Sequence, residues 1–242
     1  MRYSGATVLE SNQLPRIETA CILVHWPSPR MKTRLTLLCV PATAALRAGR
    51  FPNHEPLDPA QGAAAASVAA ALGAAIGHVD RVLRSPMPCA RDTARALHLA
   101  ANIDDALCEI DYARWAGLAL KDVAASEADA LARWLVDPHM DAHGGESICH
   151  AIARVGRWAD RVSAGIDTAG TGDTVGDAAG TAGHTLVITH ASVIKAALIH
   201  ALKAPPTAYW QLDIAPLSIT TLSAYRDSWR VTSMSVPLAH GG

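Results

Sequence analysis

Short apolar runs alternate with longer alanine-rich stretches along most of the chain, and this alternation restricts the possible folds more than any other feature. The two clearest runs are 34–40 (RLTLLCV) and 185–189 (TLVIT). Runs this short and apolar are typical of strands that are buried on both faces of a sheet. Further strands are predicted at 82–84, 106–108, 217–224 and 229–235.

The stretches between these runs predict helices. Asp58 is a good N-cap and Pro59 suits the first helical position, so a helix is expected over 58–77. Further helices are predicted at 88–100, 121–135, 146–165 and 193–203. Strands and helices in this order predict an α/β fold. It is a three-layer αβα sandwich whose central sheet is mostly parallel and is covered by helices on both faces.

The length of 242 residues fits one domain with a full-sized core, which we assign to 31–242. Residues 1–30 contain three prolines and no sustained hydrophobic period. They are interpreted as an N-terminal extension, with disorder as one option and a native start at Met31 as another. Residues 164–184 are mostly Gly, Ala, Thr and Asp, a composition that buries little surface and predicts a flexible surface loop.

Charge and composition exclude several classes of partner. The chain carries 21 basic and 22 acidic residues and one phenylalanine, so neither its field nor its aromatic content favours nucleic acid or an anionic membrane. The apolar runs are too short to span a bilayer. Five scattered cysteines without a CxxC pair argue against a disulfide framework and indicate a reducing cytoplasm. A small-molecule ligand is the expected partner, and a homodimer is compatible with the apolar helices.

Several short motifs follow one another in a fixed order between residues 34 and 235. They are 37–43 (LLCVPAT), 49–51 (GRF), 56–62 (PLDPAQG), 85–94 (SPMPCARDTA), 109–117 (EIDYARWAG), 144–147 (GGES) and 187–194 (VITHASVI). Each motif is weak alone. Their order and spacing resemble those of the histidine phosphatase superfamily, the phosphoglycerate-mutase-like proteins. The resemblance implies the phosphoglycerate-mutase-like form of the predicted sandwich.

The resemblance also implies a degenerate active site. In the family, a histidine attacks phosphorus and becomes phosphorylated, and two arginines hold the phosphoryl oxygens. The corresponding positions here are Val40, Cys39 and Cys89. Valine has no lone pair with which to attack, and each lost charged hydrogen bond costs about 1.5–3 kcal/mol. The two lost arginines predict dianion binding weaker by roughly two to four orders of magnitude, and Pro41 removes a further backbone N–H.

Two family positions keep groups that can exchange a proton. His190 matches the second histidine and Glu109 matches the candidate proton donor, with an ordinary structural role as the alternative for each. Thr43 is expected to cap a helix, and Arg50 could reach inward from a loop. The predicted ligand pocket therefore consists of Cys39, Val40, Thr43, Arg50, Cys89, Glu109, His190 and Ala191.

Three functional hypotheses follow. The first is a non-catalytic or catalytically impaired relative whose pocket retains a small ligand, with a phosphate ester as one option. The second is an active phosphomonoesterase with a modified mechanism, in which Cys39 is the nucleophile. The third is a metal or redox site formed by Cys39, Cys89 and His190, beside Glu109. Apart from that third hypothesis, no cofactor is expected.

Two further groups of residues receive a plain interpretation. His139 and His143 lie close together in a loop that contains proline and glycine, and we interpret this loop as solvated rather than as a metal site. Trp115 and Trp134 are available to line a pocket. Their apolar surroundings predict a ligand that carries less charge than a sugar bisphosphate.

Overall fold

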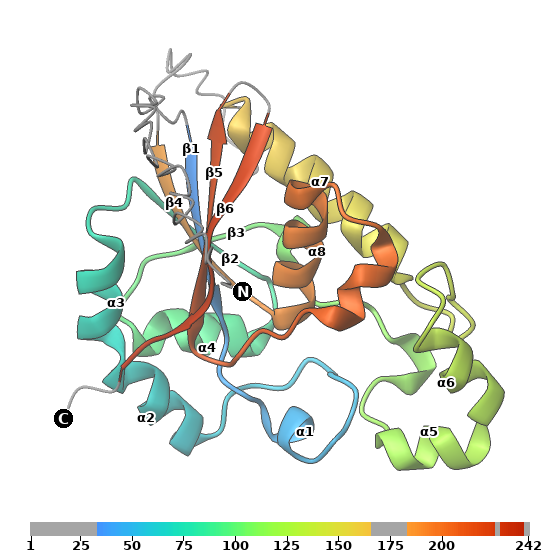
Figure 1. The fold of residues 1–242 in the computed structure, drawn as a ribbon. Coiled ribbons are helices and arrows are strands. Elements are labelled where there is room, and N and C mark those ends of the chain that lie inside the picture. The colour runs from blue at the N-terminus through green and yellow to red at the C-terminus, as the bar shows by residue number, and fades with distance from the viewer. Residues whose placement is uncertain (1–32, 166–182, 226–227, 240–242) are drawn as a thin grey trace, which may run out of the picture.

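The computed structural model describes residues 33–165, 183–225 and 228–239, and its centre is a six-stranded sheet (Figure 1). The strands lie in the order β3-β2-β4-β1-β5-β6. Parallel pairing joins β3 to β2, β2 to β4 and β4 to β1, while β5 runs antiparallel to both β1 and β6. The strands are β1 Thr33–Cys39, β2 Arg81–Arg84, β3 Asn102–Ile103, β4 Gly183–Thr189, β5 Ser218–Tyr225 and β6 Ser228–Pro237.

Helices cover both faces of this sheet (Figure 1). On one side are α2 Pro59–Ser67, α3 Ala69–Ile76 and α4 Pro88–Ala96. On the other side are α7 Ile148–Ser163 and α8 Ala191–Leu202. The remaining helices are α1 Ala44–Arg47, α5 Leu120–Ser126 and α6 Ala128–Trp134, with short 3₁₀ turns η1 Asp105–Leu107, η2 Ala113–Trp115 and η3 Pro206–Gln211. The arrangement confirms the predicted αβα sandwich.

Each face of the sheet has its own apolar core. Successive strand residues point to opposite faces, so Leu37 packs toward Trp158 of α7, whereas Leu38 packs toward Leu72 of α3. All four side chains are almost completely buried. A third cluster lies away from the sheet and joins the segments after β1, around η2 and in α6; it contains Phe51, Ile110, Tyr112, Trp115, Val123, Leu131, Met140, Ile148, Ala151 and Tyr209.

Three predicted elements differ from the structure. Residues 106–108 do not form a strand, because Asp104 accepts a hydrogen bond from the Ala106 amide and begins the turn η1, and β3 lies just before it. The helix predicted over 58–77 begins as expected, with Asp58 accepting from the Gln61 amide, but it breaks at the buried Val68. The helix predicted over 121–135 is likewise two helices, which meet at Glu127.

The ends of other elements also differ from the prediction. The helix expected to reach residue 100 ends at Ala96, and the last two strands add an antiparallel edge to the sheet. The expected extension 1–30 lies outside the described residues, as does most of the expected loop 164–184, of which 183–184 belong to β4. In the described part of the chain, no single helix is long and apolar enough to cross a membrane; α2 and α3 meet that standard only together, as a pair bent by 40°.

Candidate functional site

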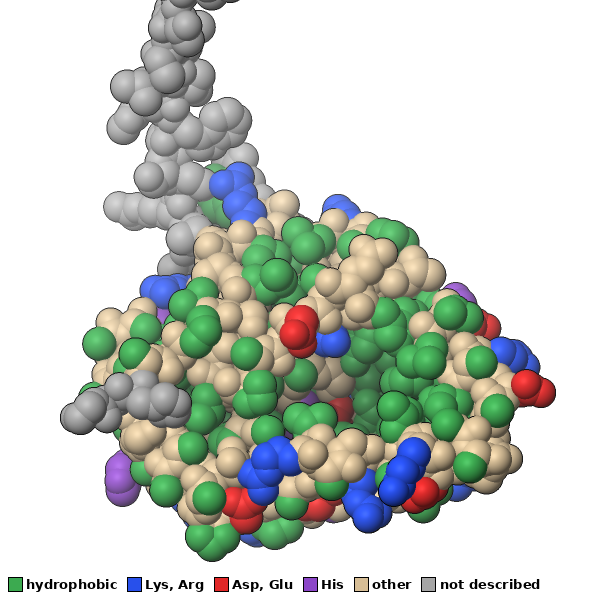
Figure 2. All heavy atoms as spheres, turned by 60° about the horizontal axis from the view of Figure 1, so that its bottom comes forward, with side chains coloured by type: hydrophobic (Ala, Val, Ile, Leu, Met, Phe, Trp, Pro, Cys, Tyr) green, Lys and Arg blue, Asp and Glu red, His purple; other side chains and the backbone are tan. Residues whose placement is uncertain are grey.

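A cavity of about 440 Å³ opens where β1 and β4 end. Figure 2 shows this face of the molecule, with a hollow whose wall is largely hydrophobic and whose depth contains acidic and histidine atoms. Ligands in open α/β sheets bind beyond the carboxyl ends of the strands, and this volume suits a small organic molecule. Seven of the eight predicted pocket residues line the cavity: Cys39, Val40, Thr43, Cys89, Glu109, His190 and Ala191.

The pairing of β1 with β4 brings the first residues of the site together. Cys39 lies opposite Thr189 in the parallel register, and the Val40 amide donates to the Thr189 carbonyl over 2.9 Å. Val40 and His190 therefore leave the sheet side by side. The chain after β1 turns at once into α1, where the Thr43 hydroxyl accepts from the Leu46 amide and caps the helix as predicted.

His190 has a polar partner on each side of its ring, a hydrogen bond on one side and a longer charge contact on the other. Its Nε2 lies 2.9 Å from the Ser85 hydroxyl, and its Nδ1 lies 3.6 Å from Oε2 of Glu109. Ser85 already accepts from the Met87 amide, and a carboxylate beside Nδ1 favours a proton there, so the Nδ1–H tautomer is the favoured one. Burial lowers the pKa of His190 and outweighs the opposing effect of Glu109. The ring is therefore neutral at pH 7.

Glu109 is the acidic group of the cavity floor, and its side chain is only 10% exposed. Its Oε1 accepts from the Ile110 amide over 2.8 Å and from the Ser192 hydroxyl. Its Oε2 has only the longer contact with His190. Within the described residues, no lysine or arginine forms an ion pair with this carboxylate. A nine-tenths buried carboxylate with one free oxygen is thus directed at the cavity.

An ion pair behind Glu109 fixes the segment that carries it. Arg154 of α7 donates to the carbonyl oxygens of Ala106 and Cys108 over 2.7 and 3.1 Å. Glu146, from the GGES motif, accepts from the same guanidinium through both carboxylate oxygens. Both side chains are mostly buried. The motif therefore supports the cavity floor from outside and does not itself bind a ligand there.

The opposite side of the floor is apolar. Cys39 and Cys89 are both buried, and burial raises the pKa of each thiol to about 12, with the negative charge of Glu109 adding to the effect. At pH 7 a thiol with such a pKa is ionised to only about one part in 10⁵. Val40 belongs to the same apolar cluster as Cys89 and Met87. Among the described residues that line the cavity, this side therefore offers no ionised thiol and no arginine.

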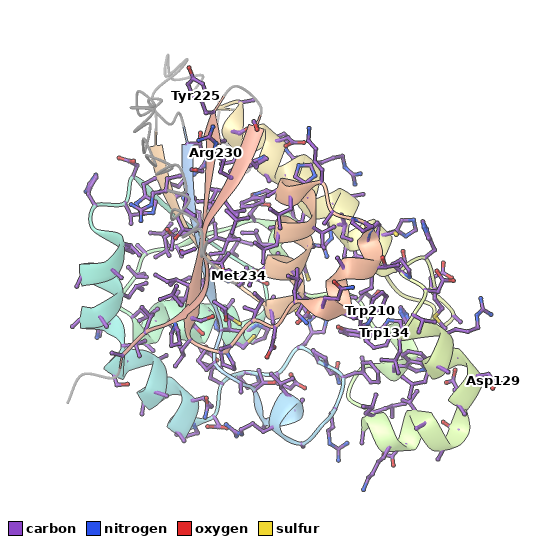
Figure 3. All side chains as sticks on the ribbon, in the orientation of Figure 1. Asp129, Trp134, Trp210, Tyr225, Arg230 and Met234 are labelled. Atoms are coloured by element: carbon purple, nitrogen blue, oxygen red, sulfur yellow. The ribbon has the colours of Figure 1, made fainter. Side chains whose placement is uncertain are left out.

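Four aromatic side chains form a further wall, which we call the aromatic wall: Tyr112, Trp134, Tyr209 and Trp210. Figure 3 shows Trp134 at the end of α6 beside Trp210 of η3; their ring centroids are 6.4 Å apart and the planes are perpendicular. The prediction that Trp134 lines the pocket is met. Trp115 instead lies in the third core cluster and is fully buried.

Other sequence predictions need correction. Arg50 does not line the cavity, because its guanidinium donates to the Gly117 carbonyl over 3.1 Å at the surface. His143 is buried rather than solvated, since its ring packs against Trp115 and its Nδ1 accepts from the Gly145 amide. Cys39, Cys89 and His190 share the cavity, but among the described residues no group of three or more potential ligands is arranged to hold a metal ion.

Several cavity residues escaped the sequence analysis. Lys195 follows Ala191 by one helical turn of α8 and so shares its face, a spacing that could have revealed it. Its ammonium lies 5.2 Å from the Tyr209 ring centroid and attracts Asp213, another lining residue. Burial lowers the pKa of Lys195, and Asp213 opposes this. No local pattern pointed to Asp213, Glu55 or Trp210.

A sequence profile of the histidine phosphatase superfamily, branch 1, matches residues 53–237. This chain belongs to that superfamily. The match begins after the segment 37–43, so the assignment of Val40 to the nucleophile position depends on its place at the end of β1 beside His190. The histidine phosphatase fold is thus present, and the expected site residues other than Arg50 meet in one cavity.

Two curated relatives match parts of the chain. Bifunctional protein Rv2228c of Mycobacterium tuberculosis is 35% identical over 165 residues, which are 63% of this chain and 42% of that protein. The match thus spans under half of this relative. Phosphoserine phosphatase 1 of Hydrogenobacter thermophilus is 29% identical over 90 residues, 35% of this chain and 43% of that protein.

Solved structures agree at the level of the fold. Mycobacterial glucosyl-3-phosphoglycerate phosphatase Rv2419c superposes with a TM-score of 0.68 at 23% identity, covering 84% of this chain and 99% of that one. A mutant phosphoserine phosphatase from Entamoeba histolytica in complex with phosphoserine gives 0.68 at 18% identity, covering 84% and 96%. At these identities the likeness extends to the fold alone.

Proposed function

We propose that this histidine phosphatase superfamily member binds a small molecule without forming a phosphohistidine intermediate. The observation that carries the proposal is the composition of the cavity. Val40 stands beside His190 where the family nucleophile is expected, and the cavity lining includes no arginine. A phosphoryl dianion placed there would face the free oxygen of Glu109 with no guanidinium to offset the repulsion.

The surviving acid–base pair does not replace a nucleophile. His190 is neutral, but its Nε2 is bonded to Ser85 and its Nδ1 faces Glu109. The Ser85 hydroxyl is fully buried and does not line the cavity. Cys39 directly precedes Val40, which stands at the expected nucleophile position, but a pKa of about 12 keeps the Cys39 thiol protonated. Covalent catalysis needs an activated, accessible nucleophile, and none of these groups supplies one.

Hydrolysis of p-nitrophenyl phosphate tests this proposal. We expect the native protein to release no more p-nitrophenol than the His190→Ala variant, with an active family phosphatase assayed in parallel. Val40→His should remain inactive as well, because the phosphate-binding cations are still missing. Circular dichroism and urea unfolding show that each variant is folded. Turnover in the native protein that His190→Ala abolishes would contradict the proposal and make Cys39 the next residue to test.

A further inference from the structure

The charged groups of the cavity are unevenly balanced. The lining contains three carboxylates, those of Glu55, Glu109 and Asp213, and one ammonium, that of Lys195. Lys195 interacts with Asp213 and lies over the Tyr209 ring. The charges of Glu109 and Glu55 thus have no positive partner in the cavity. The field of the empty cavity favours a cation, which reverses the preference that a phosphatase site requires.

Glu109 is the group that a cationic ligand would contact in this cavity. Its side chain is nine-tenths buried, and among the described residues its Oε2 accepts no hydrogen bond, with His190 Nδ1 3.6 Å away. A carboxylate oxygen has lone pairs for two donors, and a buried charge without a partner is costly. Oε1, in contrast, already accepts from Ile110 and Ser192. A ligand donor would therefore meet Oε2.

The remaining surface of the cavity is suited to an apolar body. The aromatic wall stands on one side, and Leu46, Pro52, Ile214 and Pro216 lie on others. The wall residues Tyr112 and Tyr209 are each more than nine-tenths buried, and in the described part of the chain the indole N–H groups of Trp134 and Trp210 are buried without a hydrogen-bond partner. Aromatic faces attract cations as well as apolar groups. The wall and Glu109 therefore favour the same ligand.

We propose that the cavity selects a protonated organic amine, whose N–H groups donate to Oε2 of Glu109 and whose apolar or aromatic body lies against the aromatic wall. This inference rests on the proposed function, because it takes the site to be a binding pocket and not a phosphoryl-transfer centre. It adds the charge and shape of the ligand. Cys39 and Cys89, at positions where the family resemblance implies arginines, leave this part of the lining without cations that would repel such a ligand.

Three probes of similar size test the charge selectivity. Benzylamine is a cation at pH 7, benzyl alcohol is its neutral counterpart, and phenyl phosphate is an anion. Binding is measured by calorimetry and by the change in tryptophan fluorescence, to which Trp134 and Trp210 of the aromatic wall contribute. We expect benzylamine to bind about tenfold or more tightly than benzyl alcohol, as one charge-assisted hydrogen bond allows. Phenyl phosphate should bind the weakest of the three.

The Glu109→Gln variant isolates the carboxylate. Its amide keeps an acceptor for Ile110 and Ser192 but loses the charge. Benzylamine affinity should fall by about tenfold or more, while benzyl alcohol affinity should change by less than about threefold. Glu55→Gln is the matched control and should reduce benzylamine affinity by less than Glu109→Gln. Urea unfolding confirms that both variants are folded.

Failure of this inference can be distinguished from failure of the proposed function. No detectable benzylamine binding, tighter binding of phenyl phosphate, or an unchanged benzylamine affinity in Glu109→Gln would each overturn the amine proposal. None of these results involves turnover. Hydrolysis of p-nitrophenyl phosphate that depends on His190 would instead overturn the proposed function, and the amine proposal with it.

Discussion

The two sides of the cavity floor differ in the partners of their side chains. On the β4 side, His190 is bonded to Ser85, and Glu109 to Ile110 and Ser192, so each polar group is tied to other parts of the fold. On the β1 side, Cys39, Val40 and Cys89 belong to apolar clusters. The side chains of the β4 side, which we call the polar side, form a hydrogen-bonded network, whereas those of the β1 side pack in apolar clusters.

This difference shows which site residues a fold can lose. A buried group that is bonded to other protein groups leaves unsatisfied partners when it is removed, at a cost of about 1–3 kcal/mol each. A phosphate-binding arginine has the ligand as its partner, so its replacement by a small apolar residue leaves nothing unsatisfied when no phosphate is bound. A β1 side without arginine is therefore compatible with a stable protein.

The largest expected effect comes from making the β1 side polar. In the triple variant Cys39→Arg, Val40→His and Cys89→Arg, the two guanidinium groups should tighten inorganic phosphate binding by roughly 10²–10⁴-fold over the native protein. Calorimetric titration with phosphate measures this. The control replaces both cysteines by glutamine instead of arginine and should gain little. Equal phosphate affinity in the native protein and the arginine variant would contradict the comparison, provided that the variant is folded.

Thiol chemistry gives the next largest effect. Because the pKa values of Cys39 and Cys89 are raised to about 12, their thiolate fraction at pH 8 is about 10³-fold lower than that of an ordinary cysteine. Labelling with a disulfide reagent should be slower by at least that factor than in the same chain unfolded in urea. Peptide mass spectrometry measures each position. Native Cys39 labelled as fast as in the unfolded chain would support an activated nucleophile instead.

The fold followed from the sequence because its causes are local and periodic. Apolar runs at 34–40 and 185–189 predicted two strands, and the structure pairs these two strands in the middle of the sheet. The helix break at Val68 and the turn at 105–107 were missed for another reason. Val68 leaves the helical conformation with its side chain fully buried, and Asp104 caps a turn whose apolar residue, Leu107, is also fully buried. The helix break and the turn both depend on contacts with distant parts of the chain.

The sequence predicted mainly those cavity residues that lie within a recognised motif. His190, Glu109, Cys39 and Cys89 were found because they occupy motif positions, and all four line the cavity. The aromatic wall was mostly missed, since η3 brings Trp210 to Trp134 through the tertiary fold. Arg50 was placed wrongly because its position in the motif order does not reveal that its guanidinium bonds to Gly117.

A smaller effect tests whether the polar side depends on its support. Glu146→Gln removes the charge that holds Arg154 against the carbonyl oxygens before Glu109. Both side chains are mostly buried, so we expect a loss of about 1–3 kcal/mol in the free energy of unfolding, measured with urea. Arg91→Gln, at the exposed Arg91–Asp92 pair, is the control and should change it by less than about 0.5 kcal/mol. Similar losses of unfolding free energy in both variants would mean that the Arg154–Glu146 ion pair stabilises the protein no more than an exposed ion pair does.

The smallest effect is the pH dependence that the polar side gives the protein. Burial lowers the pKa of His190 in the folded state below its ordinary value of about 6.5, and those of His143 and His184 shift in the same direction. As pH falls through 6.5, the unfolded chain binds protons that the folded chain does not, so stability falls with pH.

Urea unfolding between pH 7.5 and 5.5 measures this slope, to which one histidine contributes at most about 1.4 kcal/mol per pH unit. His190→Gln should make the slope shallower, because the new side chain does not titrate. His150→Gln, at an exposed position of α7, should leave it close to native. An unchanged slope in His190→Gln would mean that His190 binds a proton in the folded state as readily as in the unfolded chain. Below about pH 6.5 the polar side would then hold an imidazolium beside Glu109, and the preference of the cavity for a cation would weaken in that range.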